Sequence, residues 1–169
     1  MKYMVISDIH GDIIALNKVI DLYNKEDCSK LLILGDLFSY ASDSSRDDII
    51  NTLNDIKNNI ICVRGNCDYY INGILFDMPN INTITINNKL ITMTHGHLYN
   101  KNELIDMKSD IIFVGHTHIA NVDTIYNKLI VNPGSISKSR KGENSFALID
   151  NDTITIRNLD NKIIFEQAF

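Results

Sequence analysis

The sequence predicts one mixed α/β domain over residues 1–169, with two packed sheets and helices on their outer faces. Two observations support this fold class. The first half alternates short apolar runs with segments whose apolar residues recur at helical spacing, an order typical of parallel βαβ units. From about residue 80, short apolar runs separated by turn residues dominate, which indicates antiparallel strands.

In the first half we expect three strands and two helices. Uninterrupted apolar runs predict strands at 2–7, 31–34 and 60–63. Helices are expected at 12–23 and around 49–56, because apolar residues there recur at i, i+3 and i+4.

The second half is expected to contain only strands and turns. Asn-Asn at 87–88 is a hairpin signal, and Asn127, 151–152 and 160–161 carry further turn residues. The last five runs should form one closing antiparallel set. The predicted strands are 81–86, 89–94, 111–114, 122–126, 129–131, 145–149, 153–157 and 162–165.

Composition and charge argue against several classes of protein. A formal net charge of −5 disfavours a protein that coats nucleic acid, which normally shows a basic face. No run approaches the roughly 18 apolar residues of a membrane helix, and Asp8 interrupts the first apolar run too early for a signal peptide. We therefore expect a cytoplasmic protein without stable nucleic-acid or membrane binding. Its three cysteines, Cys28, Cys62 and Cys67, fit free thiols rather than a disulfide framework.

Five apolar runs end in polar clusters that contain every histidine of the chain. Ligands of open α/β sheets bind outside the carboxyl ends of strands, so five such ends from one sheet layer should converge on one site. Residues two apart in an extended chain point to the same side, which would make Asp8 with His10, and His116 with His118, two paired clamps. The clusters are Asp8-Ile9-His10-Gly11-Asp12, Gly35-Asp36, Gly65-Asn66-Cys67-Asp68, Thr94-His95-Gly96-His97 and Gly115-His116-Thr117-His118.

These clusters supply the donors of a metal site. Carboxylate, imidazole and amide donors without a thiolate suit Mn, Fe, Zn, Ni or Co. Seven donors are too many for one tetrahedral ion and fit two ions that share a bridging carboxylate. Two divalent ions would leave positive charge for a phosphate and would lower the pKa of a bound water toward about 7. The seven candidates are Asp8, His10, Asp36, Asn66, His95, His116 and His118.

Together with Asn132-Pro133-Gly134-Ser135, these motifs span residues 8–135. In this order they resemble the calcineurin-like metallophosphoesterase superfamily, most closely its small single-domain phosphodiesterase branch, the YfcE-like proteins. The resemblance implies a four-layer α/β/β/α sandwich, two divalent ions, most often Mn²⁺, and attack of a metal-bridging hydroxide on a phosphodiester. It further implies the ligand assignment: Asp8, His10 and His118 for the first ion, Asn66, His95 and His116 for the second, and Asp36 as the bridge.

The residues around the bridge are further catalytic candidates, namely Asn66, Cys67 and Asp68 beside Asp36. Many superfamily members carry a histidine where Cys67 stands, and a thiol is a poorer proton donor at neutral pH. We therefore expect activity on diesters with good leaving groups and weak activity on alkyl monoesters. A Cys67 that only fills space stays open, and Asp68 is expected to support a ligand through a hydrogen bond.

Substrate contacts are less sharply predicted. His97 fits either a supporting role or a phosphate contact. Arg64 is the favoured anion binder, whereas Lys138, Arg140 and Lys141 form a basic run that suits a solvated loop or, alternatively, a phosphate contact.

Other functions remain open on the same fold. One is a scaffold for protein contacts, as in a retromer subunit, although the complete set of donors argues against it. Another is a phosphomonoesterase or dinucleotide polyphosphate hydrolase. In either enzymatic case the partner is a small phosphoester, and exposed edge strands together with the resemblance favour a homodimer or homotetramer.

Overall fold

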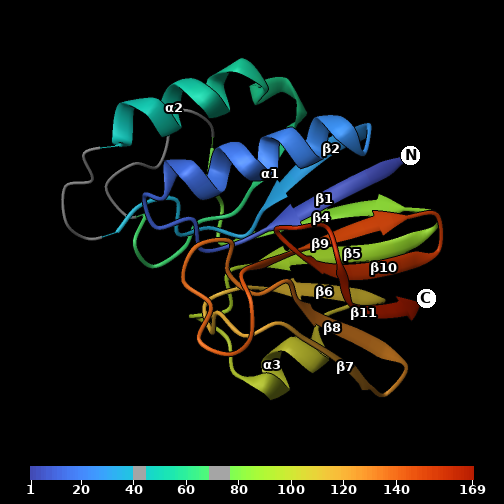
Figure 1. Cartoon of the computed structure of the whole chain (residues 1–169). Coiled ribbons are helices and arrows are strands. Elements are labelled where there is room, and N and C mark those ends of the chain that lie inside the picture. Colours follow the sequence, from blue (N-terminus) through green and yellow to red (C-terminus); the bar gives the residue numbers. More distant parts are fainter. Residues whose placement is uncertain (40–44, 69–76) are drawn as a thin grey trace.

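Two β-sheets pack face to face in the computed structural model, which describes residues 1–39, 45–68 and 77–169 (Figure 1). Helices α1 (Ile13–Lys25) and α2 (Arg46–Asp55) cover one outer face, and α3 (Lys101–Asp106) covers the other. The result is the predicted order of layers, α/β/β/α. Among the described residues, no helix is long and apolar enough to cross a bilayer.

The first sheet has six strands in the order β11-β10-β9-β1-β2-β3. The β1, β2 and β3 strands are parallel, because α1 and α2 connect them as crossovers. A short 3₁₀ turn, η1 (Lys57–Asn59), leads into β3. The strands are β1 (Lys2–Ile6), β2 (Cys28–Ile33), β3 (Ile60–Cys62), β9 (Ser145–Asp150), β10 (Thr153–Asn158) and β11 (Ile163–Ala168).

The second sheet has five strands in the order β4-β5-β6-β8-β7. Its middle strands β5, β6 and β8 are parallel, and the outer pairs β4–β5 and β7–β8 are antiparallel hairpins. The strands are β4 (Ile81–Ile86), β5 (Lys89–Thr94), β6 (Ile111–Val114), β7 (Asn121–Ile125) and β8 (Lys128–Asn132).

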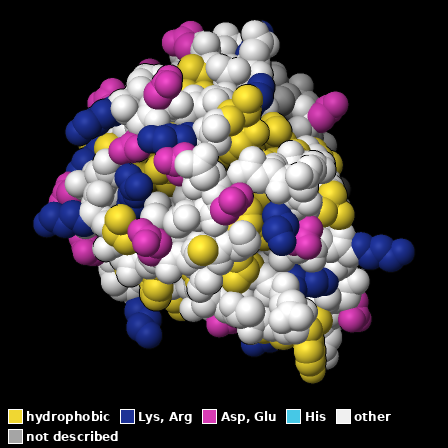
Figure 2. Space-filling view, turned by 90° about the vertical axis from the view of Figure 1, so that its right-hand side faces the viewer, with side chains coloured by type: hydrophobic (Ala, Val, Ile, Leu, Met, Phe, Trp, Pro, Cys, Tyr) yellow, Lys and Arg dark blue, Asp and Glu magenta, His cyan; other side chains and the backbone are white. Residues whose placement is uncertain are grey.

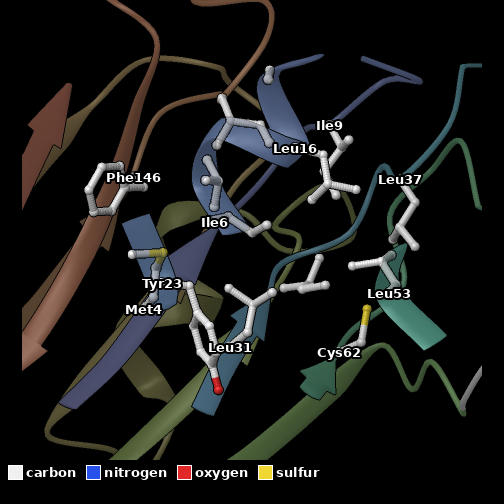
Figure 3. Packing of buried hydrophobic residues seen from close by; sticks show 14 of the residues in the cluster. Met4, Ile6, Ile9, Leu16, Tyr23, Leu31, Leu37, Leu53, Cys62 and Phe146 are labelled. Atoms are coloured by element: carbon white, nitrogen blue, oxygen red, sulfur yellow. The ribbon is translucent and has the colours of Figure 1, made fainter. Parts of the chain in front are cut away.

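Burial on both faces explains the continuous apolar runs of the central strands. Along β1, Met4 and Ile6 belong to the core beneath the helices, and Val5 belongs to the core between the two sheets. Figure 3 shows the first of these cores, in which Leu16 of α1 and Phe146 of β9 pack among β1 and β2 side chains.

Helix α1 begins at Ile13, one residue after the predicted start. The Asp12 side chain accepts a hydrogen bond from the Ala15 backbone N–H at 2.9 Å, which makes Asp12 the N-cap. The buried stripe of the helix then faces the sheet, with Leu16 and Val19 fully buried.

Two expectations about the second half are wrong. The last five strands do not form one set, because β7 and β8 belong to the five-stranded sheet and β9–β11 to the other. Leu129 of β8 and Ala147 of β9 nevertheless enter the same core from opposite sheets, so their apolar patterns are alike. Helix α3 was also missed, although Asn100 and Glu103 form a capping box at its start.

Candidate metal centre

The carboxyl ends of five strands meet at one end of the molecule. Polar clusters follow β1, β2 and β3 of the six-stranded sheet, and β5 and β6 of the five-stranded sheet. The predicted convergence is therefore present, but the expectation that one sheet layer supplies all five ends is wrong. The polar side chains that follow these five strands approach one another where the ends of the two sheets meet.

Three donors from two of these ends form the first group. The Nε2 atoms of His10 and His118 lie 3.1 Å apart, and Asp8 Oδ1 lies 3.7 Å and 3.2 Å from them, respectively. Donor atoms bound at about 2.1 Å to one ion are separated by roughly 3–3.5 Å, so this group has the dimensions of a metal site. Asp8 Oδ1 is also buried without a hydrogen-bond partner among the described residues. A cation would satisfy this oxygen, which is costly to bury unpaired.

A second group lies beside the first. Asn66 Oδ1 lies 2.9 Å from His116 Nδ1 and 3.2 Å from His95 Nε2. Between the groups, Asp36 Oδ2 lies 3.4 Å from His95 Nε2 and 3.7 Å from His10 Nε2. All seven predicted donors are therefore in one cluster, with Asp36 between the two groups.

Cys67 lies closer to this cluster than the sequence suggested. Its sulfur, the Asp36 carboxylate and His10 have donor atoms that all lie within 4.8 Å of one another. The Cys67 backbone N–H also donates to Asp36 Oδ1 at 2.8 Å, and the Asn66 amide donates to the sulfur at 3.4 Å. The Cys67 side chain thus lies beside Asp36 and belongs to a third group of candidate metal donors.

Backbone carbonyls orient two of the imidazoles. His95 Nδ1 lies 2.8 Å from the Leu34 carbonyl, and His118 Nδ1 lies 2.8 Å from the Lys138 carbonyl. A carbonyl only accepts, so each Nδ1 carries the proton and each Nε2 lone pair faces the cluster. This is the tautomer that a metal ligand needs.

The backbone of the donors differs from the predicted extended clamps. Asp8 has φ 57°, His10 φ 47°, Asp36 φ 53°, His116 φ 66° and His118 φ 59°. These left-handed conformations cost of the order of 1–3 kcal/mol each in residues other than glycine and are concentrated at functional sites. The paired donors converge because the chain turns sharply after each strand, not because it continues as a strand.

Asp68 supports the cluster from beneath. Its buried carboxylate accepts backbone N–H bonds from Asp36 at 2.6 Å, Leu37 at 2.8 Å and Gly65 at 2.8 Å. Burial raises the pKa of Asp68 to about 6, against the opposing effect of these N–H groups. The predicted supporting hydrogen bond is therefore made to the backbone of Asp36 and fixes the turn that presents it.

The motif after β8 joins the neighbouring turns. The Asn132 amide donates to the Gly115 carbonyl at 2.7 Å, and the Ser135 hydroxyl donates to the Asp8 carbonyl at 2.8 Å. These bonds connect the turns that carry His116 and Asp8. The segment therefore holds two of the turns that carry candidate donors in a fixed relation to each other.

The charges of the cluster are strongly coupled. Burial raises the pKa of Asp36, but His95 and the Cys67 N–H outweigh it and lower the value to about 2. Burial lowers the pKa of His95, yet the Asp36 and Asp8 carboxylates raise it above its ordinary value. The Asp8 carboxylate raises the pKa of His118. Without metal, these two imidazoles keep a second proton to higher pH than an ordinary imidazole does, and a bound cation competes with that proton.

A cavity of about 330 Å³ opens onto the cluster. Arg64, the favoured anion binder, is not among its lining residues, and its guanidinium donates to the Asn80 side chain at 2.8 Å. His97 is also not among the lining residues, and its ring centre lies 5.3 Å from that of His95 and 6.1 Å from that of His116. The cavity is lined by His10, Asp36, Ser39, Asn66, Cys67, His116, His118, Lys138 and Arg140.

Comparison with known proteins identifies the family. A family model described as the calcineurin-like phosphoesterase superfamily domain matches residues 1–153. The chain belongs to this superfamily. It is 29% identical to phosphodiesterase YfcE of Escherichia coli strain K12, in an alignment that covers 99% of this chain and 97% of YfcE. The solved structure of YfcE, a phosphoesterase from E. coli, matches with a TM-score of 0.90 at 28% identity over 99% of both chains.

The same fold is also found in a protein that is not named as a phosphoesterase. The structure of vacuolar protein sorting 29 from Cryptosporidium parvum matches with a TM-score of 0.71 at 19% identity, over 99% of this chain and 98% of that one. This likeness shows the fold alone. The match to YfcE over nearly the whole chain confirms both the predicted resemblance and the sandwich architecture.

Proposed function

We propose that this protein is a metal-dependent phosphodiesterase whose cluster holds two divalent ions. The convergence of seven nitrogen and oxygen donors, with the buried Asp8 Oδ1 left unpaired, supports this proposal most strongly. In this assignment Asp36 would contact both ions. The relatives named as phosphodiesterases support the reaction class. The assigned ligands are Asp8, His10 and His118 for one ion and Asn66, His95 and His116 for the other.

The bound ions and the residues around them would have separate roles. Two bound divalent ions would supply a hydroxide nucleophile at neutral pH and offset the charge of the phosphoryl oxygens. Asp68 fixes the backbone of Asp36 through its three N–H bonds. Cys67 lines the cavity where a leaving group would depart, and a thiol is a weaker proton donor than an imidazole. The substrate should therefore be a small diester whose leaving group needs little protonation.

Manganese is the proposed activating ion. The seven assigned donors are oxygen and nitrogen atoms, which suit Mn²⁺ as well as Fe, Zn, Ni or Co. Sulfur from Cys67 would shift this preference toward softer ions such as zinc. Metal identity therefore has to be measured together with activity.

The test is reconstitution of the chelator-stripped protein with each of these five metals. Bis(p-nitrophenyl) phosphate is the diester substrate, and p-nitrophenyl phosphate is the matched monoester. We expect Mn²⁺ to restore diester hydrolysis and the monoester to react more slowly. If no metal restores turnover while metal analysis shows the ions bound, the scaffold function becomes the better account. A faster monoester reaction would instead favour a phosphomonoesterase.

A further inference from the structure

Two basic side chains occupy one wall of the cavity over the proposed metal cluster. Lys138 and Arg140 line it together with His10, His116 and His118. Lys141, the third cation of the same run, is not among the lining residues. Two of the three cations of this loop therefore line the cavity.

The loop is attached directly to the donor residues. The Lys138 carbonyl accepts the His118 Nδ1 proton at 2.8 Å, and the Arg140 N–H donates to the His118 carbonyl at 3.1 Å. The Ser135 hydroxyl accepts the Lys138 N–H at 2.8 Å while donating to the Asp8 carbonyl. The backbone beneath both cations is therefore fixed relative to two proposed ligands.

Further hydrogen bonds hold the rest of the loop. The Asn144 side chain accepts the Ser139 N–H at 3.0 Å and donates to the Ser137 carbonyl at 3.1 Å. Lys138 Nζ lies 3.3 Å from Ser39 Oγ, a residue that also lines the cavity. The amine is thereby held toward the cavity, which a wholly solvated lysine would not require.

The charge balance indicates what such a wall would bind. A hydroxide and a singly charged diester would neutralise two divalent ions held by Asp8 and Asp36. The buried Asp68 carboxylate offsets at most one of the added cations, Lys138 and Arg140. At least one positive charge therefore remains for a further anionic group on the substrate.

We propose that Lys138 and Arg140 form an anion subsite that selects phosphodiesters carrying a second phosphate group. The selection of substrates rests on the proposed function, whereas the binding of the second phosphate does not. Arg140 presents a planar fork of donors suited to two phosphate oxygens, and Lys138 adds a point charge. Arg140 should therefore contribute more to the selection than Lys138.

The first test compares two substrates that differ only in the second phosphate. Thymidine 5′-(p-nitrophenyl phosphate) is hydrolysed with and without a phosphate on its 3′-oxygen, by Mn²⁺-loaded protein. We expect the wild type to favour the bisphosphate in kcat/KM, and Arg140→Gln to reduce this ratio about five- to tenfold, the effect of losing one partly exposed charged contact. Arg140→Lys should retain part of the preference for the bisphosphate. Lys141→Gln, the same charge change outside the cavity, should leave it unaltered.

The second test measures binding without turnover. Isothermal titration calorimetry of thymidine 3′,5′-bisphosphate and thymidine 5′-monophosphate is carried out with wild type, Arg140→Gln and Lys141→Gln, with and without Mn²⁺. Tighter binding of the bisphosphate that weakens only in Arg140→Gln supports the subsite. Equal affinity for both nucleotides in the wild type overturns it.

The two tests separate failure of the subsite from failure of the proposed function. Turnover of both esters with the same ratio in wild type and Arg140→Gln overturns the subsite and leaves the phosphodiesterase standing. Turnover of neither ester by metal-loaded wild type counts against the phosphodiesterase. The calorimetry then still decides whether the second phosphate is bound.

Discussion

Asp36 has two carboxylate oxygens with different neighbours. Oδ1 accepts the Cys67 N–H, whereas Oδ2 faces the Nε2 atoms of His10 and His95. With a pKa lowered to about 2, the carboxylate stays ionised throughout the physiological range. An ionised carboxylate fixed between two groups of donors is suited to contact two cations.

Asp36→Asn should therefore be the most damaging single change among the donors. It keeps the size of the side chain but removes the charge that both ions would share. Loss of a residue that merely supports a ligand costs about 10–100-fold, so we expect kcat/KM for the diester to fall by about 100-fold or more. Steady-state kinetics at saturating Mn²⁺ measure this.

Asp12→Asn is the matched control. It makes the same change of charge near the site, but Asn still caps α1, so activity should stay within about twofold. Near-normal turnover of Asp36→Asn would show that the ligand assignment is wrong.

The pKa shifts of the metal-free cluster predict how metal binding depends on pH. The raised pKa values of His95 and His118 mean that both hold protons to higher pH than an ordinary imidazole. A cation competes with these protons, so Mn²⁺ should bind more weakly as pH falls from 8 to 6, by about tenfold per pH unit for each proton displaced. Calorimetric titration in buffers of different ionisation enthalpy counts the released protons. An affinity that is constant from pH 8 to pH 6 would argue against imidazole ligands.

The convergence of the seven candidate donors could be predicted from the sequence, but not their surroundings. Each donor follows an apolar strand, and that position alone brings it to the strand ends. The left-handed backbone of Asp8 and His118 could not be predicted, because it depends on contacts such as that between Ser135 and Asp8, which lie 127 residues apart. For the same reason the sequence favoured Arg64 over Arg140 as a cavity residue.

At the scale of elements, the ends of β2 and β3 approach unusually closely. A Cβ atom on Gly35 would lie 2.3 Å from the Gly65 nitrogen, and one on Gly65 would lie 2.1 Å from Asp36 Oδ1. Only glycine permits this approach at either position. The two glycines thus set the distance between the proposed bridge and the turn that carries Asn66.

Gly65→Ala should disturb metal binding more than folding. The added methyl group must displace Asp36, so we expect Mn²⁺ affinity to fall at least about tenfold, the range seen when ligand orientation is lost. The free energy of unfolding should fall by about 1–3 kcal/mol through overpacking. Calorimetry and denaturant unfolding of the metal-free protein separate these effects.

Gly142→Ala provides the comparison. Its φ of +79° strains an alanine, but its Cβ would meet no atom within 4 Å. It should lose about 1 kcal/mol of stability and keep its metal affinity. If both variants lost Mn²⁺ affinity equally, the close approach of β2 and β3 could not be the cause of the loss.

The order of elements was predictable, but their division between sheets was not. Strands β4, β5 and β6 begin and end where apolar periodicity and the Asn87-Asn88 turn predict. Strand β8, however, lies parallel to β6 in one sheet, while β9 lies against β1 in the other. Both strands bury side chains in the same core, so their sequence patterns do not distinguish the sheets.

At the scale of the whole molecule, the two ends of the sandwich differ in character. Figure 2 shows the end at which both termini lie, where acidic and basic side chains are interspersed. The expected homodimer or homotetramer has a candidate edge in β11, with Ile163, Ile164 and Phe165 between 38% and 54% exposed. The opposite end, where five strand ends meet, concentrates the donors and the basic loop. The protein can thus be acidic overall and still bind an anionic substrate.

Anomalous diffraction at the manganese edge, from crystals grown with Mn²⁺, is the most direct measurement of the central claim. We predict two peaks about 3.5–4 Å apart, the spacing typical of two-metal sites, with Asp36 touching both. One ion should contact Asp8 and the other Asn66. A single peak, or manganese bound elsewhere while these side chains contact no ion, would contradict the two-metal assignment.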